Sequence, residues 1–249
     1  ANFINSCLEQ IAKSFKLKID GDKNFFDTDK KIDIVMSIMS NYVPNCLAKA
    51  QVRCPIKKLG NQNGMKPKYF SKKIIQAIEI AENEPYRAVT HNKGIMNGID
   101  AVLIATGNDF RAVEAGIHSY AARNGKYSSL TFAYEEKDDF IFEIKIPIAI
   151  GTVGGLTSIH PLVKWSLELL GNPSSSELMQ IIAAVGLSQN FGALRSLVTS
   201  GIQIGHMKMH LLNILNQNNA TQKQKIKAIE FFKNKLVNHN EVKNFLKSN

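Results

Sequence analysis

The sequence predicts an α+β fold that is rich in helix, contains one β-hairpin and ends in a helical C-terminal third. Three observations support this prediction. Apolar residues recur at helical spacing near both ends of the chain, two β-rich runs flank a short polar turn in its middle, and the pattern from Pro161 onward is almost entirely helical.

The first part of the chain predicts a helix, a strand and a second helix. Residues 3–15 place five apolar side chains on one helical face: Ile4, Cys7, Leu8, Ile11 and Phe15. Residues 32–40 form an apolar, β-branched run that favours a strand. Residues 74–81 return to helical spacing, and Pro85 limits how far that helix extends.

The middle of the chain predicts a hairpin with strands at 127–134 and 140–148 and a polar turn at 135–139. The glycine-rich run at 151–155 follows, but it lacks the GxGxxG spacing and gives no support for a Rossmann site. Trp165 is interpreted as a core residue. Residues 174–177 offer N-caps for a helix reaching about Leu187, and we expect further helices at 192–199, 206–215, 221–236 and 241–246.

Composition favours a globular protein of the cytoplasm. No apolar run reaches the roughly 18 to 20 residues that a membrane span needs, and the N-terminus lacks the features of a signal peptide. The three cysteines fit neither a disulfide framework nor a zinc site. The net charge of +10 is spread along the chain. Basic residues are densest at 223–235, which is interpreted as an amphipathic helix. Its basic face is either solvated or attracts the phosphates of a nucleotide or coenzyme A.

Residues 85–114 gather polar groups among glycines without helical or alternating periodicity, which indicates either a functional site or a solvated loop. The polar residues are Arg87, His91, Asn92, Lys93, Asn97, Asn108, Asp109 and Arg111. His206 and His210 are spaced as a metal pair would be, but no HExxH pattern or acidic third ligand accompanies them. No metal is therefore expected.

Four segments resemble motifs of the class II (bacterial-type) 3-hydroxy-3-methylglutaryl-coenzyme A (HMG-CoA) reductases. They are YRAVTHNKGIMNGID at 86–100, ATGND at 105–109, GLSQNF at 186–191 and GIQIGHM at 201–207. These motifs are long and irregular, and the similarity in character and order extends over nearly the whole chain. The resemblance therefore implies the fold, the chemistry and the site of that family.

The resemblance implies roles for individual residues. Lys93 matches the catalytic lysine that stabilises an oxyanion. Asp109 matches the aspartate that hydrogen-bonds this lysine, although it could also cap a helix. His206 matches the general acid that protonates the coenzyme A thiolate. Four further residues match positions near the substrate: Arg87, Asn97, Gln189 and Asn190.

The resemblance also implies three domains and a missing part. Residues 1–41 match the C-terminal remnant of a small dinucleotide-binding domain, 42–204 a large substrate-binding catalytic domain, and 205–249 a helical flap that closes over the site. Asn2 and Asn41 match the surviving contacts to NAD or NADP. The family's site lies at a dimer interface, so the resemblance implies a homodimer. The family's catalytic glutamate and most of its cofactor domain have no match here, so we expect no turnover by this chain alone, which is either a fragment, the product of a divided or truncated gene, or one half of a complementing pair.

The implied reaction is a two-step reduction of HMG-CoA to mevalonate and coenzyme A by reduced NAD or NADP, or its reverse. One alternative is an inactive remnant that binds coenzyme A thioesters or a complementing chain. A second alternative, nonspecific nucleic-acid binding driven by the +10 charge, predicts strong salt dependence. Neither nucleic acid nor membrane is the expected partner.

Overall fold

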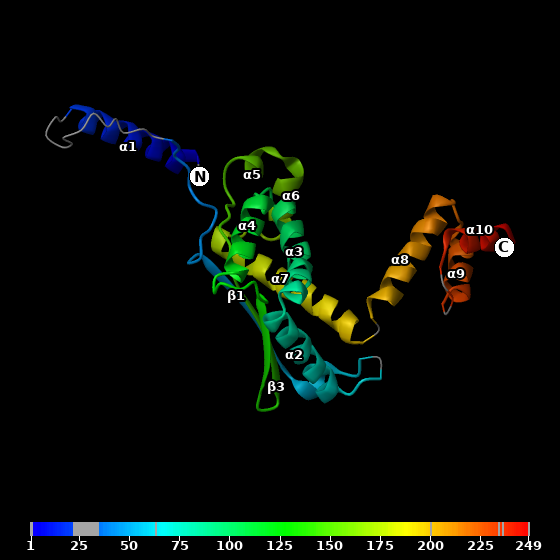
Figure 1. Cartoon of the computed structure of the whole chain (residues 1–249). Coiled ribbons are helices and arrows are strands. Elements are labelled where there is room, and N and C mark those ends of the chain that lie inside the picture. The colour runs from blue at the N-terminus through cyan, green and yellow to red at the C-terminus, as the bar shows by residue number, and fades with distance from the viewer. Residues whose placement is uncertain are drawn as a thin grey trace.

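A computed structural model describes residues 2–21, 35–62, 64–199, 201–233, 235 and 237–248, apart from the side chains of residues 2, 17, 19–21 and 202–209. Helices dominate this part of the chain, as Figure 1 shows. The helices are α1 (Asn2–Gly21), the short 3-10 helix η1 (Ile56–Leu59), α2 (Pro67–Asn83), α3 (Pro85–Ala105), α4 (Phe110–Ala121), α5 (Leu156–Ile159), α6 (Pro161–Leu169), α7 (Ser175–Val198), α8 (Ile202–Gln217), α9 (Gln222–Phe231) and α10 (His239–Ser248).

The described strands form one antiparallel sheet in the order β1-β3-β2, with bounds β1 (Leu47–Pro55), β2 (Thr131–Glu136) and β3 (Asp139–Pro147). The predicted hairpin of β2 and β3 is confirmed, and its turn holds Lys137 at a φ of 57°. β2 begins later than predicted because Ser128 and Leu130 hydrogen-bond the Asn92 side chain of α3. Strand β1 was not predicted from the sequence. Together, the sheet and the helices confirm the predicted α+β class.

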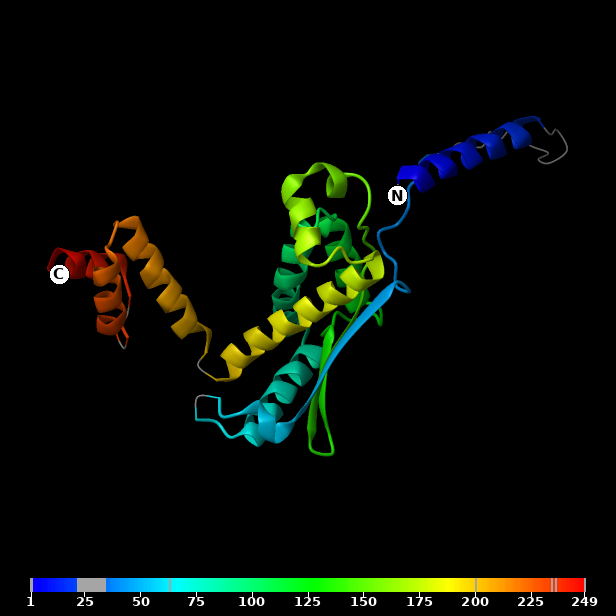
Figure 2. The ribbon, with the colours of Figure 1, turned by 180° about the vertical axis from the view of Figure 1, so that it is seen from behind.

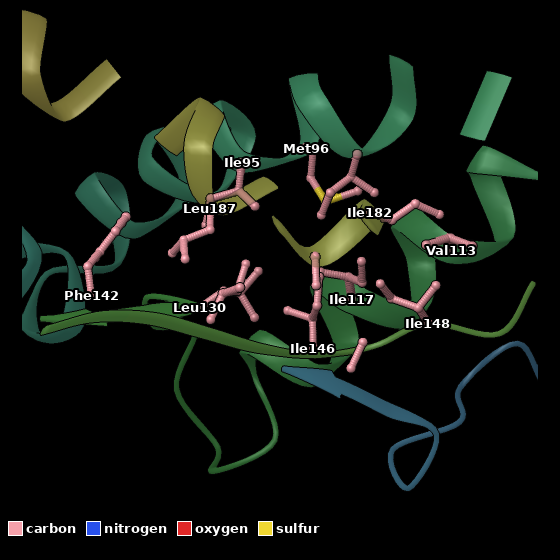
Figure 3. Close-up of a cluster of buried hydrophobic side chains, with 14 of the residues drawn as sticks. Ile95, Met96, Val113, Ile117, Leu130, Phe142, Ile146, Ile148, Ile182 and Leu187 are labelled. Carbon is pink, nitrogen blue, oxygen red and sulfur yellow. The ribbon is translucent and has the colours of Figure 1, made fainter. Parts of the chain in front are cut away.

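One face of the sheet carries the main hydrophobic core. Residues at alternate positions of β3, including Phe142, Ile144 and Ile146, are almost completely buried. Figure 3 shows Ile95 and Met96 of α3, with Ile182 and Leu187 of α7, among the side chains of the same cluster. Alternation along β3 therefore joins the sheet to the helices that present the polar residues of the candidate site.

Two glycines bring α3 and α7 into close contact, which is the most extensive helix–helix contact in the described part of the chain. A Cβ on Gly98 would lie 2.9 Å from Gln189 Cβ and 3.2 Å from the Val185 carbonyl oxygen. A Cβ on Gly186 would lie 2.9 Å from Ile99, whereas one on Gly94 would make an ordinary contact with Ala193 at 3.9 Å. Side chains at Gly98 and Gly186 would separate the helices, so these two glycines set their spacing.

Helix α7 has 24 residues and a mean hydropathy of 1.3 over its most apolar window, so by length and composition it could cross a membrane. It instead contacts α3, β1 and β3, and Leu178, Ile182 and Leu194 are completely buried. Ser174 caps its first turn, as predicted, in a reciprocal pair with Glu177. Packing in a core accounts for the apolar character of this helix.

Helices α8, α9 and α10 pack on one another around a second, smaller core, away from the main body in Figures 1 and 2. Leu215, Ala228 and Val242 are completely buried there. Ile226, which was predicted to lie on the apolar face of this region, is 63% exposed. The three-helix cluster includes most of the predicted flap at 205–249, although α8 already begins at Ile202.

Three sequence predictions were wrong. Residues 35–40 of the predicted strand at 32–40 are irregular, because no other strand pairs with them, and residues 32–34 lie outside the described part. Trp165 is 58% exposed, since Val163 and Leu167 share the buried face of α6 and Trp165 points away from it. The helix expected at 192–199 is the end of α7, because Gly192 continues that helix.

Replacing Gly98 with alanine should destabilise the fold by about 1 to 3 kcal/mol, because its Cβ would meet the backbone of α7. Gly192→Ala is the matched control, since a Cβ at that helical position meets no atom within 4 Å. It should stabilise by about 0.5 to 1 kcal/mol through reduced backbone entropy of the unfolded chain. Urea unfolding of both variants checks this, and equal stability would refute the close-packing argument.

Candidate active site

The predicted polar segment 85–114 is helical in α3 and at the start of α4, with a short connection at 106–109. Glu84 caps α3 by accepting the Arg87 backbone N–H at 2.9 Å, and Pro85 occupies the first helical position. Glycines inside the segment hid this helix from sequence analysis, since they weaken helical propensity and break apolar periodicity. Their role is to admit α7, as described above, so the irregular pattern came from close helix packing.

Three predicted site residues lie at the contact between α3 and α7. Lys93 and Asn97 are exposed and one helical turn apart on α3, so their side chains lie on the same face. Gln189 is exposed on α7, and its Cβ lies beside Gly98. The two helices thus expose one ammonium and two amide groups at the surface. Such groups can donate hydrogen bonds to carboxylate, carbonyl or oxyanion oxygens.

Asn190, predicted to contact substrate, instead lies in the interior with 1% of its surface exposed. Its Oδ1 accepts a hydrogen bond from Thr131 Oγ1 at 3.0 Å, and its Nδ2 donates to the His91 carbonyl oxygen at 3.5 Å. These bonds join α7, β2 and α3 beneath the site. A buried amide with these partners stabilises the helix contact, and its contact with substrate stays a prediction.

His91 is also buried in this network, and sequence analysis assigned no role to it. Its Nε2 lies 2.7 Å from Thr131 Oγ1. Since the Thr131 hydroxyl donates to Asn190, His91 Nε2 must donate to Thr131, which leaves Nδ1 without a partner. Burial, with a smaller contribution from nearby Arg87, lowers the pKa of His91 to about 3. The imidazole is therefore neutral at physiological pH.

Arg87 lies half-buried near the start of α3, and this burial lowers the pKa of its guanidinium. Its charge acts on His91, two positions before Lys93. Arg87 and Lys93 thus make the N-terminal half of α3 cationic. This charge distribution favours an anionic ligand at the exposed face of the helix.

The structure does not bring Asp109 to Lys93 within one chain. Asp109 caps α4 by accepting the Ala112 N–H at 3.2 Å, as predicted, and forms an ion pair with Arg111 at 3.5 Å. A hydrogen bond from Asn108 N–H to the Leu103 carbonyl holds it at the C-terminal end of α3. That end lies about 18 Å from Lys93 along the axis, at 1.5 Å per residue over twelve residues.

The remaining predicted residues are only partly described. His206 lies within α8 and Asn2 within α1, but both side chains are outside the described part of the chain. Asn41 is exposed, and a Cβ on Gly116 of α4 would lie 2.9 Å from its carbonyl oxygen. Of these residues, only the backbone of Asn41 has a described contact with the main body.

Metal binding finds no support in the part of the chain that the structure describes. No group of three or more His, Cys, Asp or Glu side chains is placed there to hold an ion. His118 has its Nδ1 2.7 Å from the Tyr127 hydroxyl.

Asp100 provides a test of the electrostatics of α3. One of its oxygens is buried without a partner, and burial, together with Glu114, raises its pKa from 3.8 to about 6. The folded state thus loses stability as pH rises from about 4 to 6 and Asp100 ionises. Asp100→Asn should stabilise the chain by about 1 kcal/mol at pH 7.5, allowing for partial exposure, but not at pH 4. Urea unfolding at both pH values checks this, and an equal effect at both would contradict it.

Comparisons with known proteins identify the family. The family model for hydroxymethylglutaryl-coenzyme A reductase matches residues 1–211. The 3-hydroxy-3-methylglutaryl-coenzyme A reductase of Archaeoglobus fulgidus is 40% identical over 230 residues, which cover 92% of this chain and 49% of the relative. A probable reductase of the same name from Borreliella burgdorferi is 36% identical over 239 residues, which cover 95% of this chain and 51% of the relative.

Solved structures agree. A 3-hydroxy-3-methylglutaryl-coenzyme A reductase from Streptococcus pneumoniae superposes with a TM-score of 0.65 at 39% identity, over 86% of this chain and 51% of the other. A class II reductase of the same organism, bound to NADPH in open conformations, superposes with a TM-score of 0.63 at 45% identity, over 66% of this chain and 45% of the other.

The chain thus shares its fold with these reductases over most of its own length. The chain belongs to the hydroxymethylglutaryl-coenzyme A reductase family. It spans about half the length of the curated relatives that it matches.

Proposed function

We propose that this chain supplies the substrate-reducing part of an HMG-CoA reductase. The reaction is the reduction of HMG-CoA to mevalonate and coenzyme A, or the reverse oxidation. The observation that carries the proposal is the exposed group of Lys93, Asn97 and Gln189 at the α3–α7 contact. Membership of the family supports it, because the matched relatives carry the name of this enzyme.

The proposed chemistry assigns one task to each group. The Lys93 ammonium stabilises the negative charge that develops on the thioester oxygen when hydride adds to its carbon. The carbon–sulfur bond then breaks, and His206 protonates the departing thiolate. Reduction of the resulting aldehyde again places charge on an oxygen near Lys93. Asn97 and Gln189 orient the substrate by hydrogen bonding.

A nicotinamide cofactor supplies the two hydrides in this proposal. Support comes from the NADPH-bound class II reductase of Streptococcus pneumoniae. Asn2 and Asn41 are proposed as this chain's contacts to it, while the choice between NAD and NADP belongs to parts of the family fold that this chain does not match. We place the reaction in the cytoplasm, without a metal, and assign closure of the site to a flap at 205–249.

Two copies of the chain are proposed to form each site. The roughly 18 Å along α3 prevents Asp109 from meeting Lys93 of its own chain, which supports a pairing with Lys93 of a second copy. A two-fold dimer would form two such pairings at once. Completion of the site further requires a polypeptide equivalent to the half of each relative that this chain does not match.

A nicotinamide absorbance assay with HMG-CoA tests the function. The 249-residue chain alone should show no turnover, and it should become active when mixed with the unmatched half of the Archaeoglobus fulgidus relative. Lys93→Ala should abolish that activity while leaving the unfolding midpoint unchanged, because Lys93 is exposed. Binding of HMG-CoA without turnover in the mixture would instead support the inactive remnant.

Mixed dimers test the shared site. Lys93→Ala and Asp109→Ala should each be inactive in the completed enzyme. If the two residues act across the dimer, an equal mixture should recover about a quarter of normal activity, because half of the dimers then contain one intact site of two. Mixing with Lys93→Arg in place of Asp109→Ala is the control and should recover nothing. An inactive mixture of dimers, with exchange confirmed by mass spectrometry, would place both residues in one chain's site.

A further inference from the structure

The sheet has two edges. β2 forms one of them, and Ser71 and Lys68 of α2 contact its Glu135 side chain on the core face, at 2.7 and 2.5 Å. β1 forms the other edge, and no strand of the described part of the chain lies beyond it. In Figure 2, β1 lies at the margin of the main body beside α7.

The register shows which backbone groups of β1 face outward. Ile148 N–H donates to the Cys46 carbonyl, and Ile56 N–H donates to the Asp138 carbonyl, so the even-numbered residues of β1 bond β3. Odd-numbered residues direct their backbone groups away from the sheet. Four have both an outward N–H and an outward carbonyl, and within the described residues none of these is bonded: Leu47, Lys49, Gln51 and Arg53.

The core beneath this edge is unfilled. A cavity of about 290 Å³ opens between β1 and α7, lined mainly by apolar side chains. It is roughly twice the 150 Å³ of an engineered apolar cavity that holds benzene. Val52, although on the core face of β1, is 51% exposed at this cavity. On the α7 side, Ala184 and Ser188 are small and exposed, so the helix leaves the space open.

Charges on β1 do not protect the edge from pairing. Exposed edge strands commonly carry lysine or proline that prevents another strand from adding. Here Lys49 is paired with Glu143 at 2.8 Å, and Arg53 with Asp139 at 3.1 Å and with Glu136. Both cations therefore lie over the outer face of the sheet, against acidic residues of the hairpin. The backbone groups of the edge remain accessible.

We propose that β1 accepts an additional β-strand, whose alternate apolar side chains fill the cavity against α7. This strand is supplied by the polypeptide equivalent to the unmatched half of the relatives, and the inference therefore rests on the complementing part of the proposed function. Backbone bonds to the four outward residues give affinity, and the cavity selects apolar side chains at every second position. Strand addition thereby completes the hydrophobic core and the sheet together.

Proline at position 51 tests the backbone bond. Gln51→Pro removes an outward N–H that β1 does not use with β3, and proline is tolerated at such positions of edge strands. It should weaken binding of the unmatched Archaeoglobus fulgidus half by about tenfold or more, measured by calorimetry. Gln51→Ala is the matched control, because it loses the same side-chain bond to Glu143 but keeps the N–H, and it should bind normally.

A cavity variant and hydrogen exchange give independent readouts. Ala184→Phe fills the space and should also weaken binding, whereas Gln180→Phe, exposed one turn earlier on α7, should not. On binding, the outward amides of Lys49 and Gln51 should gain protection, while the inward amides of Ala50 and Val52 are protected already.

Unchanged binding by Gln51→Pro and Ala184→Phe, absent protection at the outward amides, or no binding at all would each overturn the strand addition. The two proposals fail separately. Binding with protection but without HMG-CoA reduction refutes only the proposed function. Turnover in a mixture whose β1 edge stays unprotected refutes only the strand addition.

Discussion

Close contact between α3 and α7 is the constraint on which the rest of the structure depends. Gly98 and Gly186 let the two helices approach until backbone and Cβ atoms touch, and this approach sets Gln189 beside Gly98. The same helices carry the core side chains that pack on the sheet. Stability and site geometry thus rest on the same interface. A change that widens it should disturb both, because packed interiors transmit strain.

Beneath that interface, neutral hydrogen bonds do the positioning and surface groups carry the charge. His91, Thr131 and Asn190 connect three elements, and the depressed pKa of His91 keeps the network uncharged. A protonated imidazole there would add a buried cation within reach of the Arg87 charge. Burial of a neutral ring avoids this repulsion.

The sequence predicted the fold class, the hairpin and the Ser174 cap because each depends on local periodicity or capping chemistry. It did not predict α3 as a helix, because the glycines of α3 make room for α7, which lies about 90 residues further along the chain. Strand β1 was missed for a similar reason, because it is defined by pairing with β3. The resemblance located the surface residues Lys93, Asn97 and Gln189, but only coordinates could show that Asn190 is buried. Burial depends on what packs above a residue, and local sequence does not contain that information.

The length of α3 has a consequence for how this protein works in dilute solution. A straight helix separates Lys93 from Asp109 rigidly, so flexing within one chain cannot assemble the proposed pair. Two chains must then meet to form each site. The specific activity would therefore depend on the protein concentration when that concentration is near the dissociation constant of the dimer. A cell could regulate flux through such an enzyme by changing its abundance, with output that rises more steeply than the amount of chain.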